Sequence, residues 1–103
     1  MNFNKRVWNI CKKIPKGKVS TYKEIAEALK TKAYRAVGNA LNNNPYAPKV
    51  PCHRVINSNG NIGGFAKGIK SKIKLLEKEG IKIKNNKVID FKKVLYKLKQ
   101  EDL

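Results

Sequence analysis

The feature that most restricts how this sequence can fold is a proline- and glycine-rich segment, residues 45–66, that no helix can cross. It contains Pro45, Pro48 and Pro51, three of the four prolines in the chain, followed by a turn sequence that ends at Gly60. Proline fixes φ and lacks a backbone N–H, and Asn and Gly tolerate the positive φ of tight turns. The segment is therefore predicted to be a structured loop, the kind of element on which functional residues concentrate.

Apolar residues at helical spacing predict three helices before this segment. The first covers residues 3–14 and stops at Pro15. The second opens at Thr21, which has capping-box spacing to Glu24, and the third covers residues 33–43. The second and third helices are joined by a short connection, an arrangement typical of a helix-turn-helix.

After the loop segment, another helix is predicted to end at Gly80, and residues 81–89 resemble a short β hairpin. A final helix is expected after Asp90, whose side chain would cap it. The apolar face of that helix is expected to consist of Phe91, Val94, Leu95 and Leu98.

A chain of 103 residues has room for one domain. The fold class indicated is a mostly α, single small winged helix-turn-helix-like domain with a short β hairpin. Residues 1–103 are expected to form that one domain, in which residues 81–103 make a basic C-terminal hairpin and helix.

Positive charge is the strongest signal in the composition. The chain has 24 Lys and Arg residues against 7 Asp and Glu, a formal charge of +17. Such a field attracts polyanions, of which nucleic acid is the commonest, and a surface made basic for solubility alone is the alternative. Lys supplies most of the cations, so Arg6, Arg35 and Arg54 stand out as the side chains able to stack or to bind bidentately.

The sequence gives no support for a membrane, metal or secreted role. No apolar run reaches the roughly 18 residues of a membrane span, and Lys5 and Arg6 interrupt any signal-peptide core. Cys11 and Cys52 lack CxxC spacing and His53 is the one histidine, so no metal and no cofactor are expected. The protein is expected to be cytoplasmic and reduced, with no membrane contact and with Cys11 as a buried core thiol.

The residues best suited to chemistry are concentrated in the sequence Pro51-Cys52-His53-Arg54-Val55. A thiolate is the nucleophilic form of cysteine, and an imidazole can take the thiol proton when a third group, usually a carboxylate, orients it. Cys52 and His53 are adjacent, so a tight turn or a bridging water has to join them. A buried thiol beside a structural histidine is the alternative interpretation.

The same five residues belong to a longer series of motifs that resembles a known protein family. Arg35-Ala36-Val37-Gly38 and Asn44-Pro45 precede them, and Gly64-Phe65 and Leu75-Leu76-Glu77-Lys78-Glu79-Gly80 follow. In this order, and over about residues 3–83, the chain resembles the C-terminal, active-site domain of O6-alkylguanine-DNA alkyltransferases.

The resemblance implies direct-reversal DNA repair. In that family a damaged nucleotide is flipped out of double-stranded DNA, and a cysteine takes the alkyl group from guanine O6 in an SN2 displacement. The cysteine keeps the methyl or alkyl group, so the protein is a single-turnover, stoichiometric cysteine methyltransferase that needs no cofactor. Thymine O4 stays open as a second substrate position. The implied partner is double-stranded DNA containing O6-alkylguanine, bound by a monomer.

Four residues match the family's reacting and orienting groups. Cys52 matches the alkyl acceptor, His53 the base that activates the thiol through water, and Glu79 the carboxylate that orients the imidazole. Asn44 matches the hinge asparagine that tethers the turn between the recognition helix and the active site. Together they form the implied catalytic set.

Further residues match the family's DNA-binding and pocket positions. Tyr22 matches the tyrosine that promotes flipping, and Arg35 matches the arginine that fills the vacancy left by the flipped base. The recognition helix is implied to enter the minor groove and to contact DNA through Ala33, Tyr34, Ala36, Gly38 and Asn39. The substrate pocket is implied to involve Tyr22, Val55, Phe65 and Ala66, and the carbonyls of Cys52 and Val55 are implied to accept from the guanine amine.

The chain also departs from the family's pattern. The usual N-terminal domain is expected to be absent. Tyr34 stands where relatives often have a small residue, and Ala66 cannot supply the hydroxyl found in some of them, although its backbone N–H is available to guanine O6. Two other functions stay open: a non-catalytic alkyltransferase-like protein that binds lesions, and a winged-helix DNA-binding protein without chemistry. Lesion-binding relatives carry tryptophan at the acceptor position, so Cys52 favours transfer.

Overall fold

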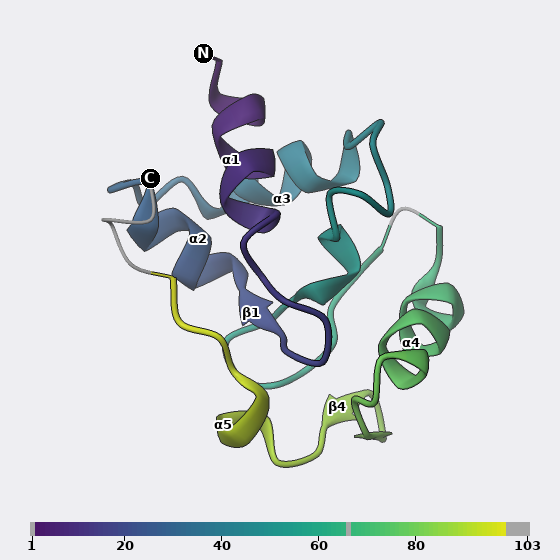
Figure 1. Ribbon diagram of the computed structural model, residues 1–103. Helices are drawn as coiled ribbons and strands as arrows, with labels where there is room; N and C mark the ends of the chain where they lie inside the picture. Colours follow the sequence, from purple (N-terminus) through teal and green to yellow (C-terminus); the bar gives the residue numbers. More distant parts are fainter. Residues whose placement is uncertain (1, 66, 99–103) are drawn as a thin grey trace.

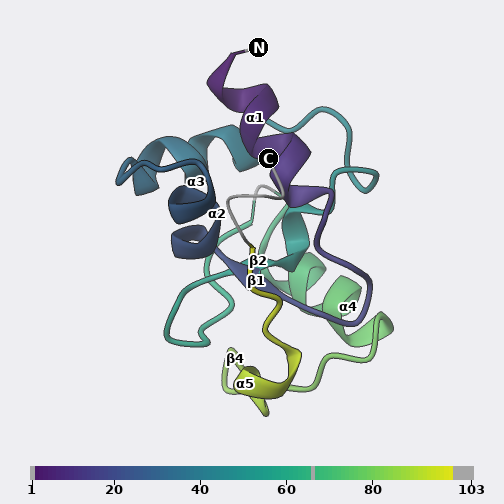
Figure 2. The same ribbon diagram turned by 60° about the vertical axis from the view of Figure 1, so that its left-hand side comes forward.

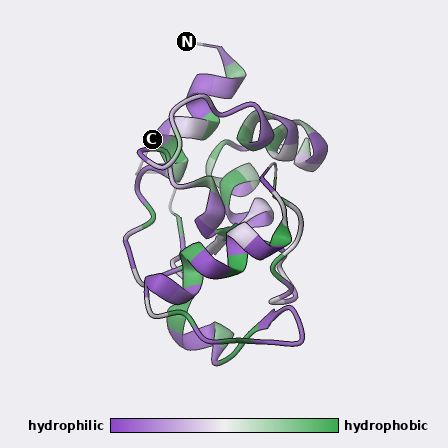
Figure 3. Ribbon diagram, turned by 90° about the vertical axis from the view of Figure 1, so that its right-hand side faces the viewer, coloured by the Kyte–Doolittle hydropathy of each residue, from purple (hydrophilic) through white to green (hydrophobic). Residues whose placement is uncertain are grey.

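Short helices surround two small sheets in the computed structural model, which describes residues 2–65 and 67–98 (Figure 1). The elements, in chain order, are α1 (Phe3–Cys11), β1 (Ser20–Thr21), α2 (Tyr22–Ala28), α3 (Tyr34–Asn42), the 3₁₀ helix η1 (Cys52–Arg54), β2 (Val55–Ile56), α4 (Ile69–Lys78), β3 (Ile83–Lys84), β4 (Lys87–Val88) and α5 (Phe91–Val94). Hydrophobic and hydrophilic residues alternate along the helices, as amphipathic helices require (Figure 3). The predicted fold class, mostly helical with a short hairpin, is confirmed.

Helix α1 begins at a side-chain cap and is shorter than predicted. The backbone N–H of Lys5 donates to Asn2 Oδ1 at 2.9 Å. After Cys11, the backbone N–H of Ile14 donates to the Cys11 carbonyl at 3.1 Å, a tighter turn than an α-helix makes. A residue that precedes proline disfavours the α conformation, and Pro15 follows Ile14. The prediction that the helix continues to residue 14 was therefore wrong.

Helices α2 and α3 form the predicted pair. The Thr21 hydroxyl accepts from the backbone N–H of Glu24 at 3.0 Å, which confirms one half of the capping box. The Glu24 carboxylate accepts from the backbone N–H of Leu98 at 2.8 Å, a contact that spans most of the chain. The buried residues of α3 are Val37, Ala40 and Leu41.

A two-residue parallel pairing connects the start of α2 with the loop segment. Ser20 and Thr21 pair with Val55 and Ile56, and the two strands lie side by side near the centre of the molecule (Figure 2). Neither η1 nor β2 was predicted, because two or three residues are too few to show a periodic pattern. The pairing places the first turn of α2 beside the end of η1.

Two groups of buried side chains hold these elements together. The larger group lies among α1, α2 and α3, and it includes Val55 and Leu98, with Cys52 packed against it. The smaller group includes Ile56 and residues from α4, the hairpin and the segment before β1. Val55 and Ile56 are neighbours in the chain but belong to different groups, so β2 joins the two cores.

The C-terminal region folds back along the strand that leads into α2. The hairpin is confirmed, with β3 and β4 antiparallel and with Asn85 and Asn86 in the turn at φ 52° and 60°. Beyond α5, the backbone N–H of Val19 donates to the Val94 carbonyl at 2.9 Å, and its carbonyl accepts from the N–H of Tyr96 at 2.7 Å. These bonds and an isolated parallel bridge between Val19 and Leu95 hold the end of α5 and the residues after it beside the chain that enters β1.

Two predictions for this region were wrong. Asp90 lies in the left-handed region at φ 57°, and its side chain makes no capping bond to α5. Leu95 and Leu98, predicted on the face of the final helix, lie beyond its end. A helix this short gains little stability by itself, so pairing with Val19 replaces further helical turns.

Residues 99–103 of the predicted basic segment lie outside the described residues. Within the part of the chain that is described, no helix has the length and apolar character to cross a membrane.

Candidate functional site

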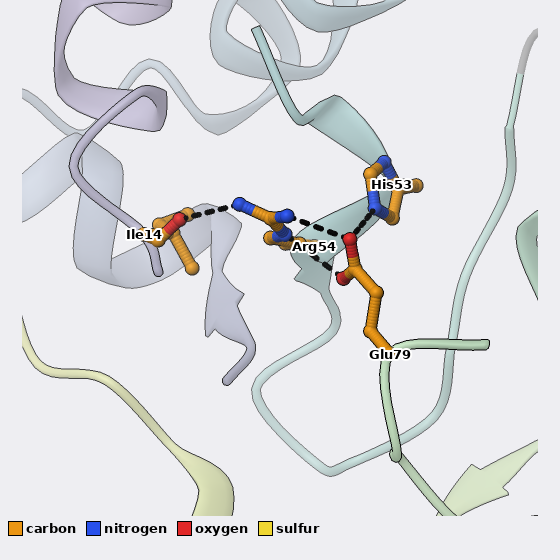
Figure 4. Close-up of polar contacts among 4 residues, drawn as sticks. All are labelled: Ile14, His53, Arg54 and Glu79. Carbon is orange, nitrogen blue, oxygen red and sulfur yellow. Dashed lines mark hydrogen bonds and ion pairs between the residues drawn. The ribbon is translucent and has the colours of Figure 1, made fainter. Parts of the chain in front are cut away.

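Glu79 is the hydrogen-bonding centre of a site formed by η1 and the end of α4 (Figure 4). Cys52 and His53 lie in η1, and Glu79 is the C-terminal cap residue of α4. Glu79 Oε2 lies 3.1 Å from His53 Nε2, although 26 positions separate the two residues in the chain. The fold therefore brings Glu79 to the Cys-His pair that the sequence singled out.

Arg54 binds the same carboxylate, a contact that was not predicted. Its Nε donates to Glu79 Oε1 at 2.9 Å and its Nη2 to Oε2 at 2.6 Å, which makes a bidentate pair. Its Nη1 donates to the Ile14 carbonyl at 2.8 Å, so the guanidinium is fixed on two sides (Figure 4). The sequence did contain a signal, because Arg54 is one of only three arginines and adjoins His53.

The charge states at this site suit His53 as a proton acceptor. Burial acts to raise the pKa of Glu79, but the bonds from Arg54 and His53 outweigh burial and hold that pKa below its usual value. Burial lowers the pKa of His53, and the contact with Glu79 opposes this only in part. His53 is therefore neutral near pH 7, with its proton on Nε2 toward Glu79 and with Nδ1 as the accepting nitrogen.

The two cysteines occupy different environments. Cys11 is fully buried, and burial raises the pKa of its thiol far above the ordinary range, so the prediction of a core thiol is confirmed. Cys52 is partly exposed at the start of η1. Within residues 2–65 and 67–98, no hydrogen bond joins the Cys52 thiol directly to His53. A proton that moves between them has to pass through a bridging water.

Asn44 ties the loop after α3 to the residues that lead into Cys52. Its Nδ2 donates to the Val50 carbonyl at 2.8 Å, and its Oδ1 accepts from the backbone N–H of Tyr46 at 2.8 Å. The same Val50 carbonyl accepts from the backbone N–H of Cys52, also at 2.8 Å. Asn44 and Cys52 thus share the Val50 carbonyl as a hydrogen-bond acceptor, and the role of Asn44 stays a prediction.

Lys72 is a buried cation that the sequence analysis missed. Its side chain is fully buried, and its Nζ donates to the carbonyls of Val55 at 2.7 Å and Gly64 at 3.0 Å. Burial lowers the pKa of Lys72 to about 8. The Nζ atom lies 5.9 Å from the centre of the Tyr22 ring. The signal was a lysine within the apolar stripe of α4, a position that usually holds a core residue.

A cleft of about 920 Å³ lies between α3, the first turn of α2 and the loop around residues 57–65. It is lined by five residues predicted to bind DNA or the flipped base: Tyr22, Tyr34, Arg35, Gly38 and Phe65. Its other lining residues include Lys23 and the polar turn Asn57, Ser58 and Asn59. Burial raises the pKa of Tyr22, so its hydroxyl keeps its proton and can donate a hydrogen bond. The cleft therefore combines three aromatic rings with two cations.

The other predicted contact residues do not line this cleft. Ala33, Ala36 and Asn39 lie in α3 or at its N-cap and are exposed or partly exposed. Val55 is fully buried, and its carbonyl already accepts from Lys72. Ala66 lies outside the described residues. The functional roles of these residues stay predictions.

Gly38 has no structural reason within the chain to be glycine. A Cβ added there would have no neighbouring atom within 4 Å, and its φ is not in the left-handed region. Glycine inside a helix costs about 1 kcal/mol relative to alanine. The absence of a side chain at Gly38 therefore leaves the outer face of α3 open to close approach by another molecule.

None of the residues that line the cleft is acidic. No acidic residue precedes Glu24, and none lies between Glu27 and Glu77. The ion pairs among the described residues both involve Glu79, so Lys23 and Arg35 in the cleft have no acidic partner there. Within the described residues, no group of three His, Cys, Asp or Glu side chains could hold a metal. The cleft is an electropositive surface suited to a polyanion.

The sequence matches one family model over most of its length. The model is described as 6-O-methylguanine DNA methyltransferase, DNA binding domain, and it matches residues 2–81. The chain belongs to this family. Within the 6-O-methylguanine DNA methyltransferase family, it is 56% identical over 82 residues to the methylated-DNA–protein-cysteine methyltransferase of Sulfolobus acidocaldarius, an alignment that covers 80% of this chain and 52% of that protein.

Two solved structures are similar to this chain in fold. One is Mycobacterium tuberculosis OGT in complex with DNA, with a TM-score of 0.73 and 45% identity, covering 77% of this chain and 50% of that one. The other is S. pombe Atl1 in complex with damaged DNA containing O6-carboxymethylguanine, with a TM-score of 0.80 and 33% identity, covering 92% and 94%. The chain thus spans about half the length of the curated relatives it matches and nearly all of Atl1.

Proposed function

We propose that this chain repairs double-stranded DNA by taking a methyl or alkyl group from guanine O6 onto Cys52, once per protein molecule. The observation that supports this most is the hydrogen bond between neutral His53 and ionised Glu79, formed directly beside the partly exposed Cys52 in η1. The chain would correspond to the C-terminal, active-site domain of the family and act as a single domain and a monomer. No step requires a cofactor.

In the proposed reaction, His53 Nδ1 takes the Cys52 proton through a water molecule, and Glu79 stabilises the resulting imidazolium. The thiolate attacks the alkyl carbon, so a sulfur–carbon bond forms while the bond from that carbon to guanine O6 breaks. The electron pair of the broken bond stays on the guanine. The proton held by His53 returns through water to the guanine, which leaves neutral guanine and an S-alkylcysteine.

The base would reach Cys52 through the cleft beside α3. The outer face of α3 would enter the minor groove, where Gly38 permits close approach and groove edges carry little sequence information. Arg35 would take the place of the flipped base, and Tyr22 would donate to the purine. The pocket would be completed by the rings of Tyr22 and Phe65. Tyr34, exposed at 45% at the start of α3, would widen the groove at its mouth.

The remaining pocket contacts are proposed at the backbone. The carbonyls of Cys52 and Val55 would accept from the guanine amine, and a carbonyl that already binds Lys72 keeps a second lone pair for this. The backbone N–H of Ala66 would donate to O6 as negative charge develops there. Ala33, Ala36 and Asn39 would contact the DNA along α3.

Intact mass measured after incubation with an O6-methylguanine duplex tests the proposal. We expect one added methyl group per chain, located on Cys52 by peptide mapping. Cys52→Ser should gain none and keep its affinity for the duplex, whereas Cys11→Ala should react as the unaltered protein does. An unchanged mass in folded, DNA-binding protein, or a methyl group on Cys11, would refute the proposal.

A second function is supported by the likeness to Atl1, which the chain matches over 94% of that protein's length. In this alternative the chain binds the alkylated base without accepting its alkyl group. The same experiment separates the two functions, because lesion-selective binding with no change in mass would favour the alternative. Cys52 itself favours transfer, since it supplies the thiol that transfer needs.

A further inference from the structure

A second hollow lies away from the cleft, between α1 and the loop of residues 45–50. It has a volume of about 280 Å³ and shares no lining residue with the cleft. Trp8 and Tyr46 form its aromatic walls, with ring centres 5.6 Å apart and ring planes at 81°. Lys5 and Lys12 of α1 also line it. The hollow thus places two aromatic rings beside two cations.

Hydrogen bonds hold the Trp8 side chain and the Tyr46 backbone in place, yet the Tyr46 side chain is largely uncovered. Trp8 Nε1 donates to the Ala40 carbonyl at 2.7 Å. The backbone N–H of Tyr46 donates to Asn44 Oδ1, and its carbonyl accepts from Val50 at 3.1 Å. Even so, Tyr46 is 54% exposed, the highest value among the large hydrophobic residues described. An uncovered aromatic ring on an anchored backbone adds little to the core, and such rings are typical of binding surfaces.

The charge around the hollow has one sign. No acidic residue precedes Glu24, and none lies between Glu27 and Glu77. Neither α1 nor the loop of residues 45–50 therefore carries negative charge. Lys5 and Lys12 are both exposed and take part in neither of the ion pairs that the described residues form. A ligand that matches this surface carries negative charge for the two lysines and a flat ring for the two aromatic side chains.

We propose that the hollow binds an unpaired base of single-stranded DNA, stacked against Tyr46, with the adjoining phosphates held by Lys5 and Lys12. Aromatic rings interleaved with cations are the general means by which proteins hold single strands. A cavity of about 150 Å³ accepts benzene, so the hollow, with nearly twice that volume, has room for the larger ring system of a base. This site goes beyond the proposed function, which concerns a duplex at α3.

The protein carries its own reporter for this site, because Trp8 is its single tryptophan. The full chain is titrated with oligothymidylate at low salt while Trp8 emission is followed. We expect saturable quenching that added salt reverses. Tyr46→Ala should weaken binding about tenfold, and Tyr46→Phe, which keeps the ring, should change it by less than about twofold. Lys5→Ala and Lys12→Ala should each make the salt dependence less steep.

Three outcomes would overturn the proposal. Binding seen by anisotropy without a change in Trp8 emission would place the strand elsewhere. Quenching that disappears in Arg35→Ala would place it in the cleft. Polyglutamate that quenches as strongly as oligothymidylate would show recognition of charge, or of an acidic protein, rather than of a base. Methyl transfer is measured separately, so its failure with quenching intact would count against the proposed function alone.

Discussion

At the scale of single residues, Glu79 sets the charge state of the candidate active site. Its carboxylate accepts two bonds from Arg54 and one from His53. The permanent charge of Arg54 keeps the carboxylate ionised, and an ionised carboxylate stabilises the imidazolium that forms when His53 takes a proton. A lysine in place of Arg54 would supply a point charge but not the bidentate fork that fixes the carboxylate plane.

The pH dependence of transfer should report the protonation of His53. Burial holds the pKa of His53 below its ordinary value of 6.5, and only the neutral imidazole accepts the Cys52 proton. The acid limb of single-turnover rates on a methylated duplex is therefore expected to have its midpoint below pH 6.5. Glu79→Gln removes the contact that partly raises this pKa, so its acid limb should lie lower and its plateau rate should be at least about tenfold smaller. An acid limb centred above pH 6.5 would contradict a neutral His53.

Lys72 should make folding stability depend on alkaline pH. Its pKa is about 8 in the folded state against 10.5 ordinarily, so between these values the unfolded chain binds more protons. The free energy of unfolding therefore gains a contribution that rises with pH across this window. We expect the unfolding free energy of the unaltered protein, minus that of Lys72→Met, to increase from pH 8 toward 10.5 in urea titrations. Lys70→Met, an exposed lysine of the same helix, is the matched control, and equal trends in the two variants would contradict the assignment.

At the scale of elements, Gly38 makes α3 less stable than alanine at the same position would. Tyr34, Gly38 and Asn42 are four residues apart, so they form one row on the helix, and all three line the cleft. Along this row, Tyr34 carries a large aromatic ring, Gly38 has no side chain, and Asn42 carries a small amide. Such a profile makes sense for a helix that presses its middle against a partner.

Gly38→Ala should separate folding from binding. The substitution is expected to raise the free energy of unfolding by up to about 1 kcal/mol, because alanine favours the helix and its methyl group meets no neighbour. It should also weaken binding to duplex DNA several-fold, because the methyl group holds α3 away from the groove. Chemical unfolding and fluorescence anisotropy measure the two effects. A variant that is more stable and binds as well as before would show that α3 does not approach DNA at this position.

The elements that the sequence predicted well are those with several turns of regular pattern. The stripes of α1, α3 and α4 and the Asn85-Asn86 turn each carry their own local signal. Leu95 and Leu98 were assigned to the final helix because their apolar spacing suits one, and only the pairing with Val19, some 75 positions away, explains why the helix ends at Val94. The contact of Arg54 with Glu79 and the buried contacts of Lys72 were missed for the same reason, since their partners are set by the tertiary fold.

At the scale of the whole molecule, the described C-terminal residues close the larger core. Leu98 is buried at 7% exposure among residues of α1, α2 and α3, and its backbone N–H is held by Glu24. The backbone N–H of Tyr96 donates to the carbonyl of Val19, the residue that precedes β1, so β1 has β2 on one edge and this segment on the other. Residues beyond the family match, Tyr96 and Leu98 among them, thus contribute to the packing of the described structure.

Leu98→Ala should therefore destabilise the whole domain. Removing a buried leucine side chain costs about 2–5 kcal/mol, and this site near the chain end should fall in the lower part of that range because it can relax. Ile89→Ala, at an exposed position of the same region, is the control and should cost well under about 1 kcal/mol. Urea unfolding compares the two variants. Similar losses in both would mean that Leu98 does not belong to the core.

The contact of Val19 with residues 94–96 also sets an order of events during synthesis. The strand that leads into Tyr22 leaves the ribosome about 75 residues before the segment that pairs with it. Contacts between such distant positions form late and slowly. The turn that carries Cys52 adjoins the same strand through β2, so it reaches its surroundings in the folded structure only after residue 96 has left the ribosome.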